Sequence, residues 1–173
     1  MKLYTLYLGM GSNLGDREGT LRRAGPLLAE RGIPVSRLSG LYETAPVGDT
    51  DQPWFLNAVA EAHTGLPPRL VLEALLGVER ALGRDRSGPG FRPGGPRSLD
   101  LDLLLYGMKR VHEADLEVPH PRLHERRFVL VPLADLAPDL VHPVLGKSVR
   151  ELLQACGDTS EVRPSSPAPP LGP

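Results

Sequence analysis

The sequence places two aspartates in the run Leu-Asp-Leu-Asp-Leu-Leu-Leu at positions 99–105, which is otherwise apolar. Successive side chains along a strand point to opposite faces, so Asp100 and Asp102 share one face of a predicted strand. Two carboxylates held this close repel each other unless a cation lies between them, and Mg²⁺ in proteins takes one or two carboxylates together with substrate phosphates. Arg97 precedes the pair after a Gly-Gly-Pro turn and offers a planar donor fork for phosphate. The pattern predicts a metal and phosphate site, and the alternative is a half-exposed strand with two solvated aspartates.

More cations stand in the segment 84–97, which is dense in Gly, Pro and Arg. It supplies Arg84, Arg86 and Arg92 in addition to Arg97. This composition is typical of a surface loop. Because the loop leads directly to the aspartate pair, we expect its arginines to bind phosphate, the alternative being a solvated linker.

An amide stands among apolar residues in a predicted strand over 54–64, directly after the polar, Pro-rich loop 43–53. Phe55 and Asn57 share one face of this strand. A buried amide costs free energy unless its donors and its acceptor are satisfied. Asn57 therefore either satisfies loop backbone or binds a polar ligand. An amide beside aromatic rings suits a flat heterocycle with hydrogen-bonding edges.

A predicted helix begins near Pro68 and ends before Gly83, with an apolar stripe formed by Leu72, Leu75, Leu76 and Leu82. Glu79 falls on this stripe, where an aliphatic residue is expected. From the residues alone it is an acid exposed at the helix tip and paired with a neighbouring arginine.

A rigid turn, Val-Pro-His-Pro at 118–121, carries His120, and His124 follows four residues later. That spacing can hold zinc on a helix face, but the H-E-x-x-H pattern is missing, so zinc is not favoured. Taken together, the carboxylate pair, the arginines and the amide with its aromatic neighbours indicate a metal-assisted transfer of a phosphoryl or pyrophosphoryl group from ATP to a small planar acceptor.

The bulk composition is that of a globular protein of 173 residues, with 40% hydrophobic and 24% charged residues. We expect one domain over 1–158 and a Pro-rich, disordered tail over 159–173. No apolar run approaches the roughly 20 residues of a membrane helix, and a net charge of -1 offers no basic field for nucleic acid. The single cysteine, Cys156, favours a reducing, cytoplasmic compartment.

The predicted elements follow the order β-α-β-β-α-β. They are strands over 3–8, 35–42, 54–64 and 99–105, one helix capped by Asp16 and a second from Pro68, with a last helix over 148–155. This order is that of a ferredoxin-like α+β sandwich with a mainly antiparallel sheet, here with a helical C-terminal extension. The Gly-rich turn 9–15 departs from the dinucleotide-binding fingerprint by one residue, and no P-loop motif is present.

Several motifs, in this order, resemble those of a known family. They are G-S-N-L-G-D (11–16), Y-E-T-A-P (42–46), Q-P-W-F-L-N (52–57), G-P-R-S-L-D-L-D (95–102) and V-P-H-P (118–121) followed by R-R-F (126–128). The chain resembles the 6-hydroxymethyl-7,8-dihydropterin pyrophosphokinases of folate biosynthesis from about Leu8 to Leu153. The resemblance implies a ferredoxin-like fold and transfer of pyrophosphate from ATP to the pterin hydroxymethyl group, with release of AMP.

The resemblance also implies roles for individual residues. Asp100 and Asp102 would bind two Mg²⁺ ions. The expected catalytic residues are Arg84, Arg97, Asp100 and Asp102. The expected ATP-binding residues are Glu79, Arg84, Arg97, His120 and Arg126. The expected pterin-binding residues are Thr44, Val47 (through its backbone), Phe55, Asn57 and Phe128, with the two phenylalanines on either side of the ring.

One position departs from the family pattern, because Gly94 stands where many members have a tryptophan before Gly-Pro-Arg. Phe91 is the candidate aromatic replacement. Two rival functions remain open: another two-metal nucleotidyl transferase, and a non-catalytic ferredoxin-like module that binds small ligands. We expect partners to be small molecules rather than nucleic acid or membrane, and the protein to be a monomer or a weak homodimer.

Overall fold

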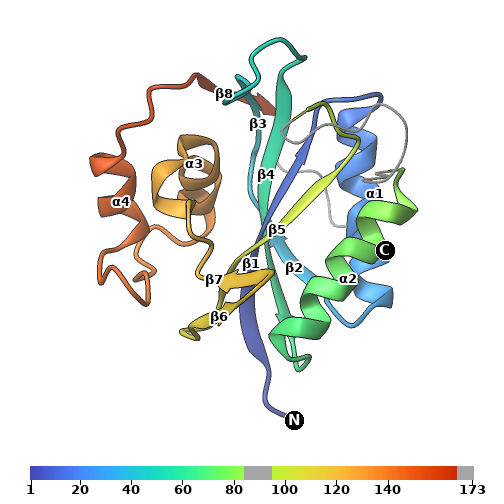
Figure 1. Cartoon of the computed structure of the whole chain (residues 1–173), viewed down its shortest axis with the longest axis vertical. Coiled ribbons are helices and arrows are strands. Elements are labelled where there is room, and N and C mark those ends of the chain that lie inside the picture. Colours follow the sequence, from blue (N-terminus) through green and yellow to red (C-terminus); the bar gives the residue numbers. More distant parts are fainter. Residues whose placement is uncertain (84–94, 167–173) are drawn as a thin grey trace.

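A six-stranded antiparallel sheet forms the centre of the protein in a computed structural model that describes residues 1–83 and 95–166 (Figure 1). The strand order is β5-β1-β4-β3-β8, and β2 pairs with the other end of β4. The strands are β1 (Tyr4–Ser12), β2 (Val35–Leu38), β3 (Leu41–Thr44), β4 (Phe55–Thr64), β5 (Asp100–Tyr106) and β8 (Val162–Ser166). A separate hairpin pairs β6 (Val111–Glu113) with β7 (Leu116–Val118).

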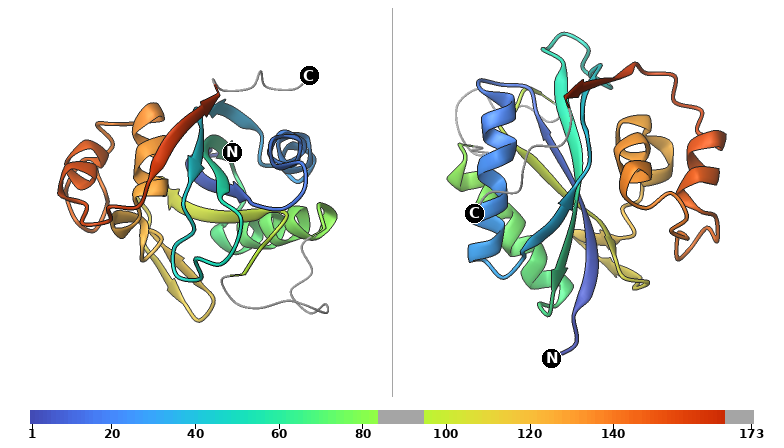
Figure 2. Two further views of the ribbon diagram at one scale, coloured as in Figure 1. Left: turned by 90° about the horizontal axis from the view of Figure 1, so that it is seen from above. Right: turned by 180° about the vertical axis from the view of Figure 1, so that it is seen from behind.

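Helices cover both faces of the sheet (Figures 1 and 2). On one face lie α1 (Arg17–Glu30) and α2 (Pro68–Ala81), and on the other lie α3 (Arg127–Leu136) and α4 (Val149–Ala155). A short 3₁₀ helix, η1 (Leu123–Glu125), precedes α3. The order β1-α1-β2/β3-β4-α2-β5 confirms the predicted ferredoxin-like sandwich and its helical C-terminal extension. None of the helices within the described ranges is long and apolar enough to cross a membrane.

Alternation along the strands separates two hydrophobic cores. Leu8 and Leu101 pack in the core beneath α1 and α2, whereas Val59 and Leu104 pack in the core beneath α3. Asp100 and Asp102 share the face of Leu104, because they are spaced two residues apart along β5. The local period of two thus places the aspartate pair on the α3 side of the sheet.

Two predicted elements differ in detail. The strand expected over 35–42 is divided into β2 and β3, because the buried Ser39 hydroxyl accepts the backbone N–H of Val59 and interrupts the regular ladder. The fully buried stripe of α2 consists of Val71, Leu75 and Val78 together with Glu79. Of the predicted leucines, Leu75 is buried, and Leu72 and Leu82 pack partly buried against the same core.

The expectation of a disordered tail over 159–173 does not hold for residues 162–166, which form the edge strand β8 against β3. Pro164 is tolerated there because an edge strand has one side whose N–H groups need no ladder partner. Residues 167–173 lie outside the described ranges. The division of the chain into a domain over 1–158 and a tail stays a prediction.

Candidate active site

The side chains of Asn57, Asp100 and Asp102 lie close together across the sheet, because β1, the strand between them, carries glycines at the paired positions. Gly11 on β1 is paired with Asp100 on one side and with Asn57 on the other, and Gly9 is paired with Asp102. A side chain on Gly11 would collide with Oδ1 of Asn57. The glycines therefore leave an open floor between the aspartate pair and the amide.

A cavity of about 610 Å³ lies above this floor. Its lining brings together most of the predicted site residues: Thr44, Val47, Phe55, Asn57, Arg97, Asp100, Arg126 and Phe128. A smaller cleft continues from it and is lined by Gly9, Gly11 and Asp102, with Asn57, Asp100 and Phe128 common to both. The predicted phosphate and acceptor sides thus adjoin in one space.

The aspartate pair is electrostatically unfavourable without a cation. Burial, and then the charge of Asp100, raises the pKa of Asp102 to about 7, while Arg126 and Arg97 oppose this rise. Arg97 forms an ion pair with Asp100, with 3.0 Å between Nη1 and Oδ2. Burial lowers the pKa of Arg126, and the charge of Asp102 opposes that change. Two oxygen-donor side chains, each near an arginine, match the ligand set that Mg²⁺ uses with substrate phosphates.

No group of three or more metal-ligating side chains occurs within residues 1–83 and 95–166. A cation at the Asp100–Asp102 pair would therefore complete its coordination with water or substrate oxygens, as Mg²⁺ does when it binds a nucleotide. The donor set fits a magnesium–nucleotide complex better than a closed structural metal site.

Asn13 is a structural residue of the site that the residue-by-residue reasoning did not single out. Its Oδ1 accepts the backbone N–H of Arg97 at 2.8 Å, and its Nδ2 donates to Gln52 and to the carbonyl of Pro53. It thereby joins the end of β1, the loop before β4 and the backbone of Arg97. The only sequence signal for it is its place in the G-S-N-L-G motif.

The acceptor side is built on β3 and β4. Asn57 is 9% exposed, and its Nδ2 donates to Oγ1 of Thr44 at 2.7 Å, which fixes the orientation of the amide. Phe55 contacts the Arg97 guanidinium, which lies 5.4 Å from the ring centroid. Val47 is 54% exposed at the rim of the cavity. The hydrogen bond to Thr44 supports a structural role for Asn57, and its place in the cavity lining supports ligand binding as well.

Glu79 lies behind β5 and lines neither of these two spaces. It is 2% exposed, and its Oε2 accepts the backbone N–H of Leu101 at 2.9 Å. The interpretation of Glu79 as an exposed acid at a helix tip is therefore wrong. Arg84, Phe91 and Gly94 lie outside the described residues.

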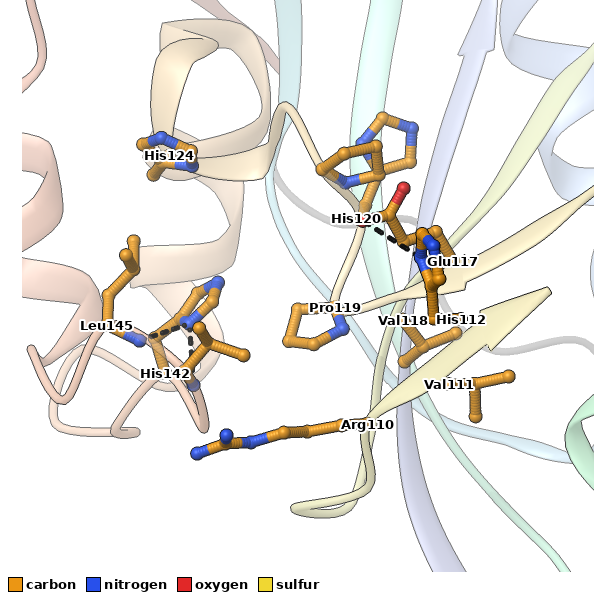
Figure 3. A pocket seen from close by; sticks show the side chains of 12 residues that line it. Arg110, Val111, His112, Glu117, Val118, Pro119, His120, His124, His142 and Leu145 are labelled. Carbon is orange, nitrogen blue, oxygen red and sulfur yellow. Dashed lines mark hydrogen bonds and ion pairs between the residues drawn. The ribbon is translucent and has the colours of Figure 1, made fainter. Parts of the chain in front are cut away.

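His120 lies in the wall of a second cavity, of about 340 Å³, between the β6–β7 hairpin and the C-terminal extension (Figure 3). His124 and His142 line the same space, which lacks the aspartate pair. Nδ1 of His120 accepts the backbone N–H of Arg122 at 3.2 Å, which leaves Nε2 as the protonated nitrogen of the neutral ring. Burial, and then the charge of Arg126, lowers the pKa of His120 to about 4.

Residues 7–138 match the family model of 7,8-dihydro-6-hydroxymethylpterin-pyrophosphokinase (HPPK). The chain belongs to the HPPK family. The 2-amino-4-hydroxy-6-hydroxymethyldihydropteridine pyrophosphokinase of Methylorubrum extorquens is 49% identical to it over 148 residues, which cover 85% of this chain and 90% of the relative. The enzyme of the same name from Bacillus subtilis is 45% identical over 131 residues, covering 75% of this chain and 76% of the relative.

Solved structures of HPPK-DHPS proteins share the fold. One crystal structure, in complex with substrates, superposes with a TM-score of 0.72 at 13% identity and covers 90% of this chain and 43% of that chain. The wild-type Plasmodium falciparum protein with pteroate gives a TM-score of 0.68 at 16% identity, covering 89% and 42%. At this identity the likeness concerns the fold alone.

Family membership confirms the predicted activity. The protein transfers pyrophosphate from ATP to 6-hydroxymethyl-7,8-dihydropterin in folate biosynthesis. ATP is its co-substrate, and its substrates are small molecules.

Proposed function

We propose that the pyrophosphoryl transfer takes place over the glycine floor of β1, with ATP phosphates at the aspartate side and the pterin at the amide side. The observation that carries this assignment is the register Asp100–Gly11–Asn57, which holds the two sides in one row of the sheet. Neighbouring antiparallel strands lie about 5 Å apart. The row therefore brings the donor phosphate and the acceptor hydroxyl within one small space.

Asp100 and Asp102 are the proposed ligands of Mg²⁺, which we expect to bind as two ions. Magnesium at this position supplies charge neutralisation on the transferred phosphates and on the acceptor oxygen. Arg97 and Arg126 line the same cavity and donate to phosphate oxygens. Together these side chains favour the build-up of negative charge toward the AMP leaving group.

On the acceptor side, we propose that Phe55 and Phe128 lie on either face of the pterin ring. Asn57 presents its amide to the polar edge of the heterocycle, and Thr44 holds that amide in place through the 2.7 Å hydrogen bond. The backbone near Val47 closes the rim of the cavity. Fixing the ring in this way turns the transfer into a reaction between two oriented groups.

His120 and Arg84 are proposed contacts of the nucleotide, whereas Glu79 is proposed to act on the nucleotide side only through its hydrogen bond to Leu101 on β5. A neutral His120 donates from Nε2 without adding charge. The compartment and assembly remain predictions: a cytoplasmic enzyme, monomeric or weakly dimeric, with no nucleic-acid or membrane partner. Sedimentation of the purified protein measures the assembly directly.

AMP formation by the purified protein tests the site. We expect AMP, and not pyrophosphate, to appear only when ATP, hydroxymethyl-dihydropterin and Mg²⁺ are all present, and EDTA to abolish it. Asp100→Asn and Asp102→Asn should each lower kcat by about 10²-fold or more, since the charge that holds the metal is lost. Asp139→Asn is the matched control, because Asp139 is an exposed aspartate paired with Arg150.

Release of pyrophosphate would support the rival nucleotidyl transferase. Unchanged turnover in both aspartate variants would exclude the proposed metal site. Varying the Mg²⁺ concentration at fixed ATP shows whether turnover requires one Mg²⁺ ion or two. If a second ion is required, the rate still depends on free Mg²⁺ after all of the ATP is bound to Mg²⁺.

A further inference from the structure

The segment 158–166 touches both sides of the proposed pterin cavity. It leaves α4, passes the start of α3 and ends as β8 beside β3 (Figures 1 and 2). We call it the C-terminal strap. None of its residues lines the cavity itself, and Thr159, Glu161 and Arg163 are exposed.

At its first end the strap caps α3. Oδ2 of Asp158 accepts the backbone N–H of Arg127 at 2.9 Å, while its Oδ1 accepts the backbone N–H of Ser160 at 2.9 Å and the Ser160 hydroxyl at 2.5 Å. The residue before α3, Arg126, provides no side-chain cap of its own. The first N–H groups of a helix need such partners from elsewhere in the chain. Asp158 thus fixes the turn that carries Arg126 and Phe128.

At its second end the strap holds the opposite wall. The carbonyl of Glu161 accepts the backbone N–H of Ala45 at 3.1 Å, and β8 continues with Val162 opposite Thr44. The guanidinium of Arg163 lies 4.6 Å from the ring centroid of Trp54, at the other end of the loop that contains Val47. The strap therefore borders Thr44 and the loop 45–54, which form the amide side of the cavity.

The other end of α3 is tied to β3 independently, because the Tyr42 hydroxyl donates to Oδ2 of Asp135 at 2.6 Å. That contact lies at the C-terminal end of the helix, whereas Phe128 lies at its N-terminal end. The strap therefore supplies the tie to β3 at the end of α3 that carries Phe128.

We propose that the C-terminal strap is a positioning element that sets the separation between the Phe128 wall and the Thr44 wall of the pterin cavity. This inference rests on the proposed pterin site. A cavity whose walls are fixed in advance binds a flat ligand with a smaller ordering cost. Loosening the strap should therefore weaken pterin binding more than ATP binding. Phe128 and Arg126 move with the turn, whereas Arg97, Asp100 and Asp102 on the phosphate side are anchored on β1 and β5.

Substitution of Asp158 in the full chain tests the first end. For Asp158→Ala we expect the KM for the pterin to rise about fivefold or more, because the Arg127 N–H loses its acceptor together with the two contacts of Ser160, and we expect the KM for ATP to rise by a smaller factor. Asp158→Asn should recover part of the parent value, because its amide oxygen can still accept the Arg127 N–H, whereas its amide nitrogen cannot accept from Ser160. Asp139→Ala serves as the control for removing an exposed acid from the same extension. Thermal unfolding is measured for each variant to exclude loss of the fold as the cause.

Arg163→Ala tests the second end separately. The chain has one tryptophan, so fluorescence reports on Trp54 alone. We expect the KM for the pterin to rise in Arg163→Ala, and the Trp54 emission to change in Asp158→Ala as well, although Asp158 is at the far end of the strap.

Three results would overturn the proposal: an unchanged KM for the pterin in both alanine variants, an equal rise of the KM for ATP, or a KM for the pterin in Asp158→Asn that is no lower than in Asp158→Ala. The variant Asn57→Ala distinguishes failure of the strap proposal from failure of the proposed pterin site. If Asn57→Ala raises the KM for the pterin and the strap variants do not, only the strap proposal fails. If Asn57→Ala leaves the KM unchanged, the proposed pterin site fails.

Discussion

Oε2 of Glu79 on α2 accepts the backbone N–H of Leu101 at 2.9 Å, and Leu101 is the residue between Asp100 and Asp102. Within residues 1–83 and 95–166, β5 pairs with β1 alone in the central sheet, so its other side is an open edge, where the Leu101 N–H donates to Glu79. The Glu79 carboxylate thus accepts the hydrogen bond that the backbone of a neighbouring strand would accept in the interior of a sheet. The contact anchors the backbone of β5 between Asp100 and Asp102.

Glu79→Ala should lower the free energy of unfolding by about 1–3 kcal/mol, because the buried N–H of Leu101 loses its acceptor. Glu79→Gln should stay close to the parent, since an amide oxygen can accept the same hydrogen bond. Urea unfolding measures both, with Glu73→Ala as the control for an exposed glutamate on the same helix. Equal stability of Glu79→Ala and Glu73→Ala would contradict the role of the contact.

Asp102→Asn should be more stable than the parent in EDTA, by about 0.5–2 kcal/mol, although it loses activity. Burial and the charge of Asp100 make the Asp102 carboxylate unfavourable, and the amide removes that charge at nearly the same volume. Thermal unfolding without divalent cations gives the comparison. A melting temperature below that of the parent would show that the carboxylate stabilises the metal-free fold.

Gly11→Ala should weaken pterin binding by about tenfold or more, because the added methyl group collides with Oδ1 of Asn57 and must displace the amide. Gly25→Ala is the matched control, since a methyl group there meets nothing within 4 Å on α1, where alanine also favours the helix. Steady-state kinetics with varied pterin measures the effect. A Gly11→Ala enzyme with the parent KM would show that the floor need not stay open.

Thr44→Val should raise the KM for the pterin about five- to tenfold, because Nδ2 of Asn57 loses its acceptor and the amide is free to turn. Thr44→Ser keeps the hydroxyl and should behave like the parent. The KM for ATP is the internal reference, and a parallel rise in both constants would indicate a general disturbance of the sheet instead.

His120 should titrate with a pKa of about 4, followed through its ring C–H signals by NMR. Burial and the neighbouring Arg126 and Arg122 disfavour the charged ring, while Asp100 favours it. Below about pH 6.5 the unfolded chain binds a proton that the folded protein does not, so stability should fall as the pH decreases from about 6.5 to 4. His120→Asn should remove this part of the pH dependence. A titration midpoint of His120 near pH 6.5 would show instead that its imidazole ring is solvated.

Features that depend on neighbouring residues were predictable from the order of amino acids. The period of two along a strand placed Asp100 and Asp102 on one face, and Asp16 caps α1 as predicted, accepting the N–H of Gly19. Proline also marks the start of α2 at Pro68. These signals are local, so they can be read without knowing what lies beside each element.

Features that depend on pairing between distant segments became visible only in the folded protein. Only the register of β1 with β4 and β5 shows that Gly11 separates Asp100 from Asn57. Glu79 interrupts an apolar stripe, yet it is buried because the open edge of β5 supplies an N–H. The strap over 158–166 has little apolar surface and forms because β3 offers a free edge. Register and free edges arise from long-range pairing, which hydrophobic periodicity within one segment does not encode.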